Sequence, residues 1–345
     1  MFRAGIIGCG NIAAVHAWAI SQLDDVSLKV LCDVKEQKAD RLLPYADRDV
    51  VIVRDWKMLF DPEIDVVHIC TPHYLHAPMA AELLDHGKYV FLEKPCAISR
   101  ESYEFLKQAD LRNPGHLGIC FQNRYNQTTL RAEQILRDGG IGEIRGARAF
   151  VTWRRDEDYY SSGTWRGKKK TEGGGALINQ AIHTFDLLLK FLGKPERVES
   201  TISNHHLKDA IEVEDTVEAW LSFKDGKRAC FYASNGFCCD APNILEIYGE
   251  KGQVVIRGEE LYILSSTGGR GSLPALKYQE DHVNKKVHEH DSTPDDKGMG
   301  KGCWGVGHLD CIRDFYNSIK ENREFAVDLK STEKTFDILM KIYGN

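Results

Sequence analysis

The chain of 345 residues is long enough for two domains of ordinary size. Its composition, 42% hydrophobic and 28% charged, is that of a soluble globular protein, and no apolar run approaches the ~20 residues that span a bilayer. The net charge of -6 gives no electrostatic reason to expect a nucleic acid or an anionic membrane as partner.

The cysteines and the N-terminus predict a reduced cytoplasmic protein. The first residues lead directly into a strand and a glycine turn, without the layout of a signal peptide. The ten cysteines have neither the spacing of a zinc site nor a secretory context for disulfides. The segment His288–His290 lies in a polar stretch, which favours a solvated loop over a metal site. No metal is therefore expected.

Up to about residue 122, Val/Ile/Leu-rich segments alternate with helical segments. Such segments are typical of strands covered on both faces, and the alternation indicates βαβ units and a parallel sheet. The predicted strands are Arg3–Ile7, Ser27–Cys32, Val50–Val53, Val66–Cys70, Tyr89–Leu92 and Leu117–Phe121. The predicted helices include Ile12–Gln22, Ala77–His86 and Arg100–Asp110. Residues 1–122 are thus predicted to form a doubly wound α/β domain.

After residue 122, strands follow one another directly. They are Ile144–Thr152, Arg197–Asn204, Val213–Phe223, Arg228–Ser234, Asn243–Tyr248, Gln253–Arg257 and Glu259–Leu264. Lys224–Lys227 and Gly249–Gly252 are typical of hairpin turns. Residues 123–345 are therefore predicted as an α+β domain with a large, mostly antiparallel sheet. The polar segment Leu273–Gly305 is predicted as a loop. Two closing helices, Gly307–Asn322 and Thr332–Tyr343, could pack back toward the first domain.

A glycine turn joins the first predicted strand to the first helix. Gly8 permits the tight turn, and Gly10 lets the backbone approach a pyrophosphate at the helix N-terminus. Asp33 ends the second strand, where an acid bonds the ribose 2′-hydroxyl and repels a 2′-phosphate. NAD is the predicted cofactor, and NADP stays open because Lys35 and Arg41 are nearby cations. The alternative is an ordinary tight turn with an exposed acid. The predicted contacts in this region are Gly8, Gly10, Asn11, Ile12 and Asp33.

Two later strands end in polar residues. Thr71 follows the fourth strand and Glu93-Lys94 the fifth. Ligands of doubly wound sheets bind beyond the carboxyl ends of the strands, so Thr71, His76 and Glu93 are expected near the cofactor. The same argument places Lys94 at the functional edge of the sheet. The alternative is a surface lysine with Glu93 as its ionic partner.

The segment Glu172–Gly193 is predicted as a buried helix, because apolar residues cover most of its circumference. Asn179, His183 and Asp186 are spaced four and then three residues apart, which places them on one face. A polar face on a buried helix indicates a ligand site or a buried polar cluster that satisfies itself.

The segments "GCGNIA", "CTPHYLH", "EKP" and "GGGALINQAIHTFDLL" occur in the order and spacing of the Gfo/Idh/MocA oxidoreductases. The chain resembles this family over essentially its whole length. The resemblance implies a Rossmann domain, a C-terminal domain with a large antiparallel sheet, and dehydrogenation of a sugar, cyclitol or related carbinol with NAD(P). It also implies a homodimer or homotetramer formed through the open face of that sheet.

The resemblance also implies roles for individual residues. In the family, the lysine of the EKP motif points at the substrate hydroxyl, and a histidine on the second domain's first long helix is the usual acid/base. These are Lys94 and His183 here, expected together in a cleft between the domains, where the glycine run would let backbone approach a ligand. Asn179 stands where many members have Asp and is expected to hydrogen-bond substrate or cofactor. Other expected substrate contacts are Arg124, Tyr125 and Asp186, and other expected cofactor contacts are Gln122, Lys94, Trp165 and Arg166. The alternatives are a domain-bridging ion pair for Arg124 and a role in orienting His183, or another N–H partner, for Asp186.

Three functions stay open at this point. The Asn-Gln pair before His183 and the stretch "WRRDEDYY" followed by "WRG" resemble the nucleotide-sugar branch, the UDP-N-acetyl-glucosaminuronate 3-dehydrogenases. The alternatives are a non-catalytic NAD(P)-binding regulator and a dehydrogenase of a non-sugar substrate such as a trans-dihydrodiol. Retention of both Lys94 and His183 argues against the regulator.

Overall fold

The computed structural model describes residues 1–161, 163–265, 277–281 and 307–344. The chain divides into two compact units. The first contains Met1–Gln122, Lys170–Gly173 and the described residues 307–333, and the second contains Asn123–Lys169 with the remaining described residues. The division falls at Gln122, and residues 307–333 belong with the first unit. Within the described ranges, no helix is long and apolar enough to cross a membrane.

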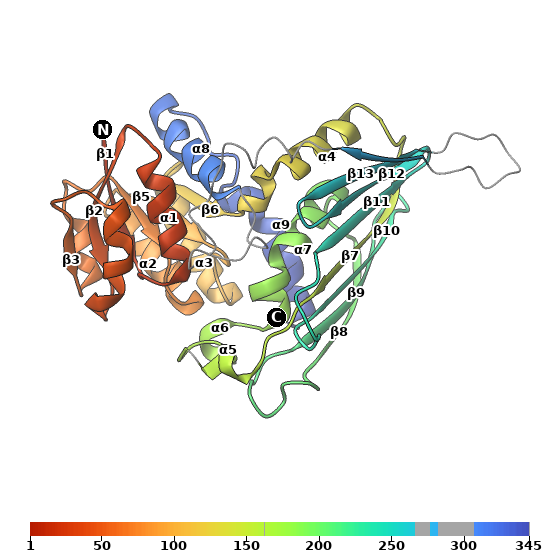
Figure 1. The fold of residues 1–345 in the computed structure, drawn as a ribbon, viewed down its shortest axis with the longest axis horizontal. Coiled ribbons are helices and arrows are strands. Elements are labelled where there is room, and N and C mark those ends of the chain that lie inside the picture. The colour runs from red at the N-terminus through yellow and green to blue at the C-terminus, as the bar shows by residue number, and fades with distance from the viewer. Residues whose placement is uncertain (162, 266–276, 282–306, 345) are drawn as a thin grey trace, which may run out of the picture. The chain divides into compact units, whose positions relative to one another are not determined.

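The first unit is built on a six-stranded parallel sheet, drawn in red to orange in Figure 1. Its spatial order is β3-β2-β1-β4-β5-β6, which reverses direction between β1 and β4. The strands are β1 (Phe2–Ile7), β2 (Val26–Cys32), β3 (Val51–Val53), β4 (Val66–Ile69), β5 (Tyr89–Glu93) and β6 (Leu117–Cys120). The predicted doubly wound sheet is confirmed, and its switch point is the place where such sheets bind ligands.

Helices cover both faces of this sheet. They are α1 (Asn11–Ser21), α2 (His73–Asp85), α3 (Arg100–Arg112) and α8 (His308–Glu321), with 3-10 turns at Glu36–Tyr45 and Trp56–Phe60. Right-handed crossovers leave β1 and β4 in opposite directions, so α1 and α2 cover opposite faces. Accordingly α1 packs with α8, and α2 packs with α3. The helix predicted from Ala77 begins at His73, which places His73 and His76 in its first turns.

The second unit is built on an eight-stranded sheet with the order β14-β13-β12-β11-β7-β10-β9-β8. Every neighbouring pair is antiparallel except β7 and β10, so the predicted mostly antiparallel sheet is confirmed. The strands are β7 (Ile144–Thr152), β8 (Arg197–Ser203), β9 (Thr216–Ser222), β10 (Arg228–Ser234), β11 (Ile244–Gly249), β12 (Gly252–Arg257), β13 (Glu260–Ser265) and β14 (Lys277–Asp281).

Strand β14 corrects the sequence prediction, because it lies inside the segment predicted as a loop. Its backbone pairs with β13 from Leu261↔Asp281 to Ser265↔Lys277. Hydrogen bonds along the edge of a sheet do not depend on apolar side chains, so a polar segment can be a strand there. The other residues of Leu273–Gly305, including His288–His290, lie outside the described residues.

The two faces of this sheet differ. One face carries small and apolar side chains, such as Ala219 and Phe231, and α7 (Ile182–Leu192) packs on it (Figure 1). The rings of Phe185 on α7 and Phe231 on β10 lie 4.9 Å apart. The other face carries Trp220, which is 66% exposed. The unit also contains α4 (Gln127–Arg137), α5 (Glu157–Ser161) and most of α9 (Leu329–Ile342), whereas α6 (Lys169–Glu172) belongs to the first unit apart from Lys169.

Candidate active site

The glycine turn after β1 has room for a phosphate-bearing ligand. Gly8 has a φ of +88°, and a Cβ there would lie 2.7 Å from the carbonyl oxygen of Cys70, so only glycine fits. Gly10 is the N-cap of α1, and a Cβ there would meet no atom within 4 Å. No side chain caps the helix and its first turn carries no acid. These features fit the diphosphate of a dinucleotide, which would face the free N–H groups of α1.

Asp33 is held in a fixed orientation beside this turn. One carboxylate oxygen accepts the Cys9 N–H at 3.0 Å, and the other accepts the Lys35 N–H at 2.8 Å. Lys38 Nζ lies 3.9 Å from the same carboxylate, a cation that the sequence analysis did not name. Arg41 donates a hydrogen bond to Asn11 Oδ1 at 2.9 Å. The predicted ribose-binding acid is thus oriented by backbone, with cations near the phosphate turn.

Thr71 and His76 lie where β4 meets α2. Thr71 Oγ1 is buried and has no hydrogen-bond partner among the described residues, which is unusual unless a ligand supplies one. The buried ring of His76 lies 2.7 Å from Pro95 O through Nδ1 and 2.8 Å from Thr71 O through Nε2. Burial lowers the pKa of His76. His76 therefore links the end of β4 to the EKP segment, and its contact with the cofactor stays a prediction.

Glu93 is buried rather than paired with Lys94 on the surface. Its carboxylate contacts His16 Nε2 at 3.0 Å and accepts the backbone N–H of Lys94 at 3.2 Å. Burial alone raises the pKa of Glu93, but the hydrogen bond with His16, together with the charge of Lys94, outweighs this effect and holds the pKa below its ordinary value. Glu93 thus fixes the backbone at Lys94.

The predicted helix over Glu172–Gly193 is wrong as a single element. Residues Lys169–Glu172 form α6, Ala176–Ala181 form a π-helical segment, and α7 begins at Ile182. Asn179 therefore lies in the π-helical segment, whereas His183 and Asp186 lie in α7, so the α-helical spacing argument does not join Asn179 to His183. Short π-helical segments occur frequently at functional sites. His183 is half-buried in the first turn of α7.

The break has a physical cause in Glu214, a buried acid that the sequence analysis missed. Its carboxylate accepts the backbone N–H groups of Gly175 and Leu177 at 2.8 and 3.0 Å, and the hydroxyl of Tyr343 at 2.8 Å. Burial raises the pKa of Glu214, and these bonds oppose that effect. They satisfy free donors at the start of a helix, so the helix restarts here.

Two residues of the glycine run pack against other protein atoms, and the approach of this backbone to a ligand stays a prediction. A Cβ on Gly175 would lie 2.0 Å from Glu214 O, and one on Gly174 would lie 2.3 Å from the Tyr343 hydroxyl. Packing against protein atoms therefore requires glycine at both positions.

Arg124 and Asp186, predicted substrate contacts, bind each other. Arg124 Nε and Nη2 each donate to Asp186 at 2.7 Å, and Thr335 Oγ1 donates to the same carboxylate at 2.7 Å. Both members of the pair are buried and both belong to the second unit. This is a buried ion pair with a bidentate geometry. These contacts give no support to substrate binding by either residue, and they provide Asp186 with partners other than His183.

Arginine and aromatic side chains alternate in one stack of the second unit. The Arg166 guanidinium lies 4.8 Å from the Trp165 ring and 4.9 Å from the Tyr159 ring, and the Arg155 guanidinium lies 5.3 Å from the same Tyr159 ring. Gln180 Nε2 donates to the Tyr159 hydroxyl at 3.1 Å, which ties the stack to the segment that carries Asn179. The stretches "WRRDEDYY" and "WRG" contain the stacked residues, but nothing in their local pattern predicts the stack.

The two guanidinium groups of the stack differ in their partners. Arg155 pairs with Asp240 at 2.8 Å. In the part of the chain that the structure describes, Arg166 forms no ion pair, so its charge is available to an anionic ligand. The remaining predicted contacts, Gln122 and Tyr125, lie in the 3-10 turn Gln122–Tyr125, where Gln122 is buried.

Two family comparisons decide the relationship of the chain to known proteins. Residues 2–113 match the oxidoreductase family with an NAD-binding Rossmann fold, and residues 129–255 match the GFO/IDH/MocA C-terminal domain. The chain belongs to the Gfo/Idh/MocA oxidoreductase family. Its first unit is therefore an NAD-binding Rossmann domain, in agreement with the open turn at Gly10.

Individual Gfo/Idh/MocA proteins are similar along most of the chain. Myo-inositol 2-dehydrogenase of Thermotoga maritima is 23% identical over 300 residues, 83% of this chain and 85% of that protein. The structure of levoglucosan dehydrogenase with NADH and levoglucosan has a TM-score of 0.84 at 21% identity and covers 99% of this chain and 97% of its own. The structure of the WlbA dehydrogenase of Bordetella pertussis with NADH and UDP-GlcNAcA has a TM-score of 0.79 at 24% identity. The match covers 99% of this chain and 95% of the WlbA chain.

Proposed function

We propose that the protein transfers a hydride between NAD and a carbinol of a sugar, cyclitol or nucleotide sugar. One observation carries the proposal. Gly10, Thr71 and Lys94 follow β1, β4 and β5, which are neighbours in the parallel sheet, so all three lie at its carboxyl edge. That edge combines an open phosphate turn, a buried hydroxyl without a partner among the described residues, and a lysine, which suits a dinucleotide and a carbinol substrate.

The residues have distinct chemical roles in this proposal. Bound NAD supplies the nicotinamide carbon that accepts or donates the hydride. His183 takes the proton of the substrate hydroxyl during oxidation and returns it during reduction. The ammonium group of Lys94 stabilises the negative charge that develops on the same oxygen. Asn179 cannot accept a proton, so it holds substrate or cofactor by hydrogen bonds.

A nucleotide sugar is the substrate class that the second unit favours. Arg166, stacked between two rings and without an acidic partner in the described residues, can bind a diphosphate or a carboxylate. Either the cofactor or the substrate can supply that anion. The solved WlbA relative, which holds UDP-GlcNAcA, is consistent with this class. A cytoplasmic location is part of the same proposal.

Incubation of the protein with NAD and a panel of sugars, cyclitols and UDP-sugars tests this function, with the absorbance of reduced nicotinamide as readout. We expect oxidation in one of these classes. If the protein binds NADH but oxidises no member of the panel, a non-catalytic regulator or a non-sugar substrate such as a trans-dihydrodiol becomes the better account.

We expect tighter binding of NADH than of NADPH, because the fixed Asp33 carboxylate repels a 2′-phosphate. Calorimetric titration with both cofactors measures the difference. Asp33→Asn keeps an oxygen that can accept the Cys9 N–H but removes the charge. It should therefore narrow the preference by about tenfold, a change of ~1.4 kcal/mol. Equal affinities in the unmodified protein would mean that Lys38 or Arg41 dominates.

We propose self-association through the open face of the eight-stranded sheet. Trp220 on this face is 66% exposed, and the rings of Phe150, Tyr232 and Phe237 form a series with centroids 6.4 Å apart. Exposed apolar patches usually mark interfaces. Trp220→Asp should yield a monomer by sedimentation, whereas Leu111→Asp, an equally exposed apolar position on α3, should leave the assembly unchanged. A monomeric unmodified protein at micromolar concentration would contradict the proposal.

A further inference from the structure

A chain of buried polar side chains crosses the first unit and ends at Glu93. Tyr316 Oη lies 3.0 Å from His68 Nε2, and His68 Nδ1 lies 3.0 Å from His16 Nδ1. His16 Nε2 in turn lies 3.0 Å from Glu93 Oε1. The four residues come from α8, β4, α1 and β5, and all are buried. No part of the proposed chemistry uses the first three.

The protons of this chain can be placed from the charge of Glu93. An ionised carboxylate can only accept, so His16 donates through Nε2. In the tautomer of His16 that carries its proton on Nε2, Nδ1 accepts the N–H of His68, and His68 Nε2 accepts the Tyr316 hydroxyl proton. Burial lowers the pKa of His68 and raises that of Tyr316, which favours the neutral forms of these two groups. In this arrangement every donor in the chain has an acceptor.

Two buried histidines hold the backbone at Lys94, His16 through the Glu93 carboxylate and His76 through Pro95 O. On one side, the carboxylate that His16 contacts also accepts the Lys94 N–H at 3.2 Å. On the other side, Pro95 O lies 2.7 Å from His76 Nδ1. The two histidines come from α1 and α2, which cover opposite faces of the sheet. The backbone of the EKP segment is therefore held from both faces.

We propose that His16 is a positioning residue that acts through Glu93 to hold Lys94 at the carboxyl edge of the sheet. His68 and Tyr316 orient the His16 ring so that Nε2 faces the carboxylate. The value of this arrangement for catalysis rests on the proposed function, in which Lys94 acts on the substrate hydroxyl. A displacement of about 1 Å in a group of that kind can lower the rate by roughly a hundredfold.

His16 Nε2 lies 3.0 Å from Glu93 Oε1, and several other groups lie near the same carboxylate. Cys70 follows β4, Cys120 ends β6, and His308 and Cys311 come from α8. Cys70, Cys120 and His308 interact with Glu93, and Cys311 interacts with Cys120. Thiols are weak donors compared with an imidazole N–H. Loss of the His16 N–H would leave a buried carboxylate without this bond, which is costly because a buried charge needs hydrogen-bond partners.

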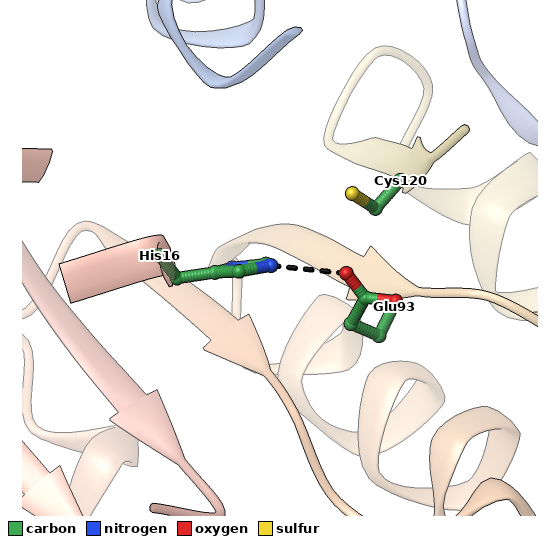
Figure 2. A group of neighbouring side chains, drawn as sticks. All are labelled: His16, Glu93 and Cys120. Atoms are coloured by element: carbon green, nitrogen blue, oxygen red, sulfur yellow. Dashed lines mark hydrogen bonds and ion pairs between the residues drawn. The ribbon is translucent and has the colours of Figure 1, made fainter. Parts of the chain in front are cut away.

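The same place contains a set of potential metal ligands. Figure 2 shows His16, Glu93 and Cys120, whose ligand atoms all lie within 4.8 Å of one another. A metal would require the thiolate, but burial raises the pKa of Cys120 well above its ordinary value. The hydrogen bond between His16 and Glu93 accounts for their arrangement without an ion, so we assign these two residues to the positioning chain.

The test compares two replacements of His16. His16→Gln keeps an N–H donor close to the place of Nε2, whereas His16→Phe has a similar volume and no donor.

Labelling of Lys94 with an amine-reactive reagent, read by mass spectrometry across pH, reports the environment of Lys94 without any substrate. We expect His16→Phe to change the labelling rate of Lys94 several-fold and to lower kcat by roughly 10–100-fold, with KM much less affected. His16→Gln should restore both. Glu93→Gln keeps the shape of Glu93 and removes its charge. If His16→Phe fails to fold, Glu93→Gln takes its place, and we expect it to show the same changes in Lys94 labelling and kcat.

Four outcomes separate this inference from its alternatives. Labelling and kcat unchanged in both His16→Phe and Glu93→Gln would overturn it. Altered Lys94 labelling in these variants, together with full activity of Lys94→Ala, would support the positioning role and reject the proposed function. Equal losses in His16→Gln and His16→Phe would assign His16 a role in packing and overturn the inference. Stoichiometric zinc by mass spectrometry in the purified protein, lost in Cys120→Ser, would overturn it in favour of a metal site.

Discussion

Replacement of His183 by alanine should lower turnover by ~10²–10⁴-fold, the usual contribution of a positioned acid/base. The affinity for NADH should stay near that of the unmodified protein, because the phosphate turn and Asp33 belong to the other unit. Steady-state kinetics on the true substrate and calorimetry with NADH measure the two quantities. Lys94→Ala should lose at least as much activity and can also weaken cofactor binding, since Lys94 adjoins the cofactor edge of the sheet.

Two matched variants show whether the loss of turnover in His183→Ala is caused by removal of the imidazole. Lys190→Ala, on the same helix, removes a surface ion pair with Glu133 at 2.9 Å and should leave activity unchanged. Asn179→Asp restores the residue found in many relatives and should be tolerated if Asn179 only positions groups. Wild-type turnover by His183→Ala would mean that His183 is structural and that the proposed acid/base is wrong.

Replacement of Gly10 by valine should abolish NADH binding, with an affinity at least about a hundredfold lower, and should leave the fold intact. The side chain would occupy the space that the pyrophosphate needs. In the structure, a Cβ on Gly10 meets no atom within 4 Å, and the backbone at φ -79° and ψ -168° is extended, a conformation that valine adopts readily. Calorimetry measures the affinity, and thermal unfolding without cofactor measures the fold.

The neighbouring glycine provides the control for this variant. Gly8→Val should destabilise the protein itself, because its φ of +88° is strained for valine and its Cβ would lie 2.7 Å from Cys70 O. A lower melting temperature is thus expected for Gly8→Val alone. Normal NADH affinity in Gly10→Val would contradict the assignment of the phosphate turn.

The first unit was predictable from sequence because its signals are local. Its strands are apolar runs, most of which end at a glycine, proline or acid, and the turn at Gly8 and Gly10 has a fixed spacing to the helix that follows. The strands β7 and β10 were predicted to the residue for the same reason. Even Asp33 and Lys94 could be placed, since each directly follows a predicted strand.

The second unit departs from prediction where distant residues decide the local structure. Glu214 binds the N–H groups of Gly175 and Leu177, almost forty residues earlier in the chain, and no periodicity in Glu172–Gly193 reports that contact. The ion pair between Arg124 and Asp186 also joins residues that are distant in the sequence, so no local pattern reports it. Buried polar partners of this kind look like ligand-binding residues in a sequence, because both are polar positions in apolar surroundings.

The polar chain from Tyr316 to Glu93 shows the same limit in the first unit. Its four residues are spread from α1 to α8, and each alone looks like an ordinary buried or surface residue in the sequence. Only the sheet order, which places β4 between β1 and β5, brings His68 close to His16 and Glu93. The sequence could therefore predict the position of Lys94 but not the residues that hold it.

Transfer of deuterium tests the central claim most directly. The substrate identified by the panel is labelled with deuterium at its carbinol carbon and mixed with the protein and NAD, and the reduced cofactor is examined by NMR and mass spectrometry. The account predicts deuterium at C4 of the nicotinamide, with a slower single turnover than for the unlabelled substrate, and loss of this transfer in the Lys94→Ala, His183→Ala double variant. Substrate consumption without deuterium on the cofactor, or equal transfer by the double variant, would contradict it.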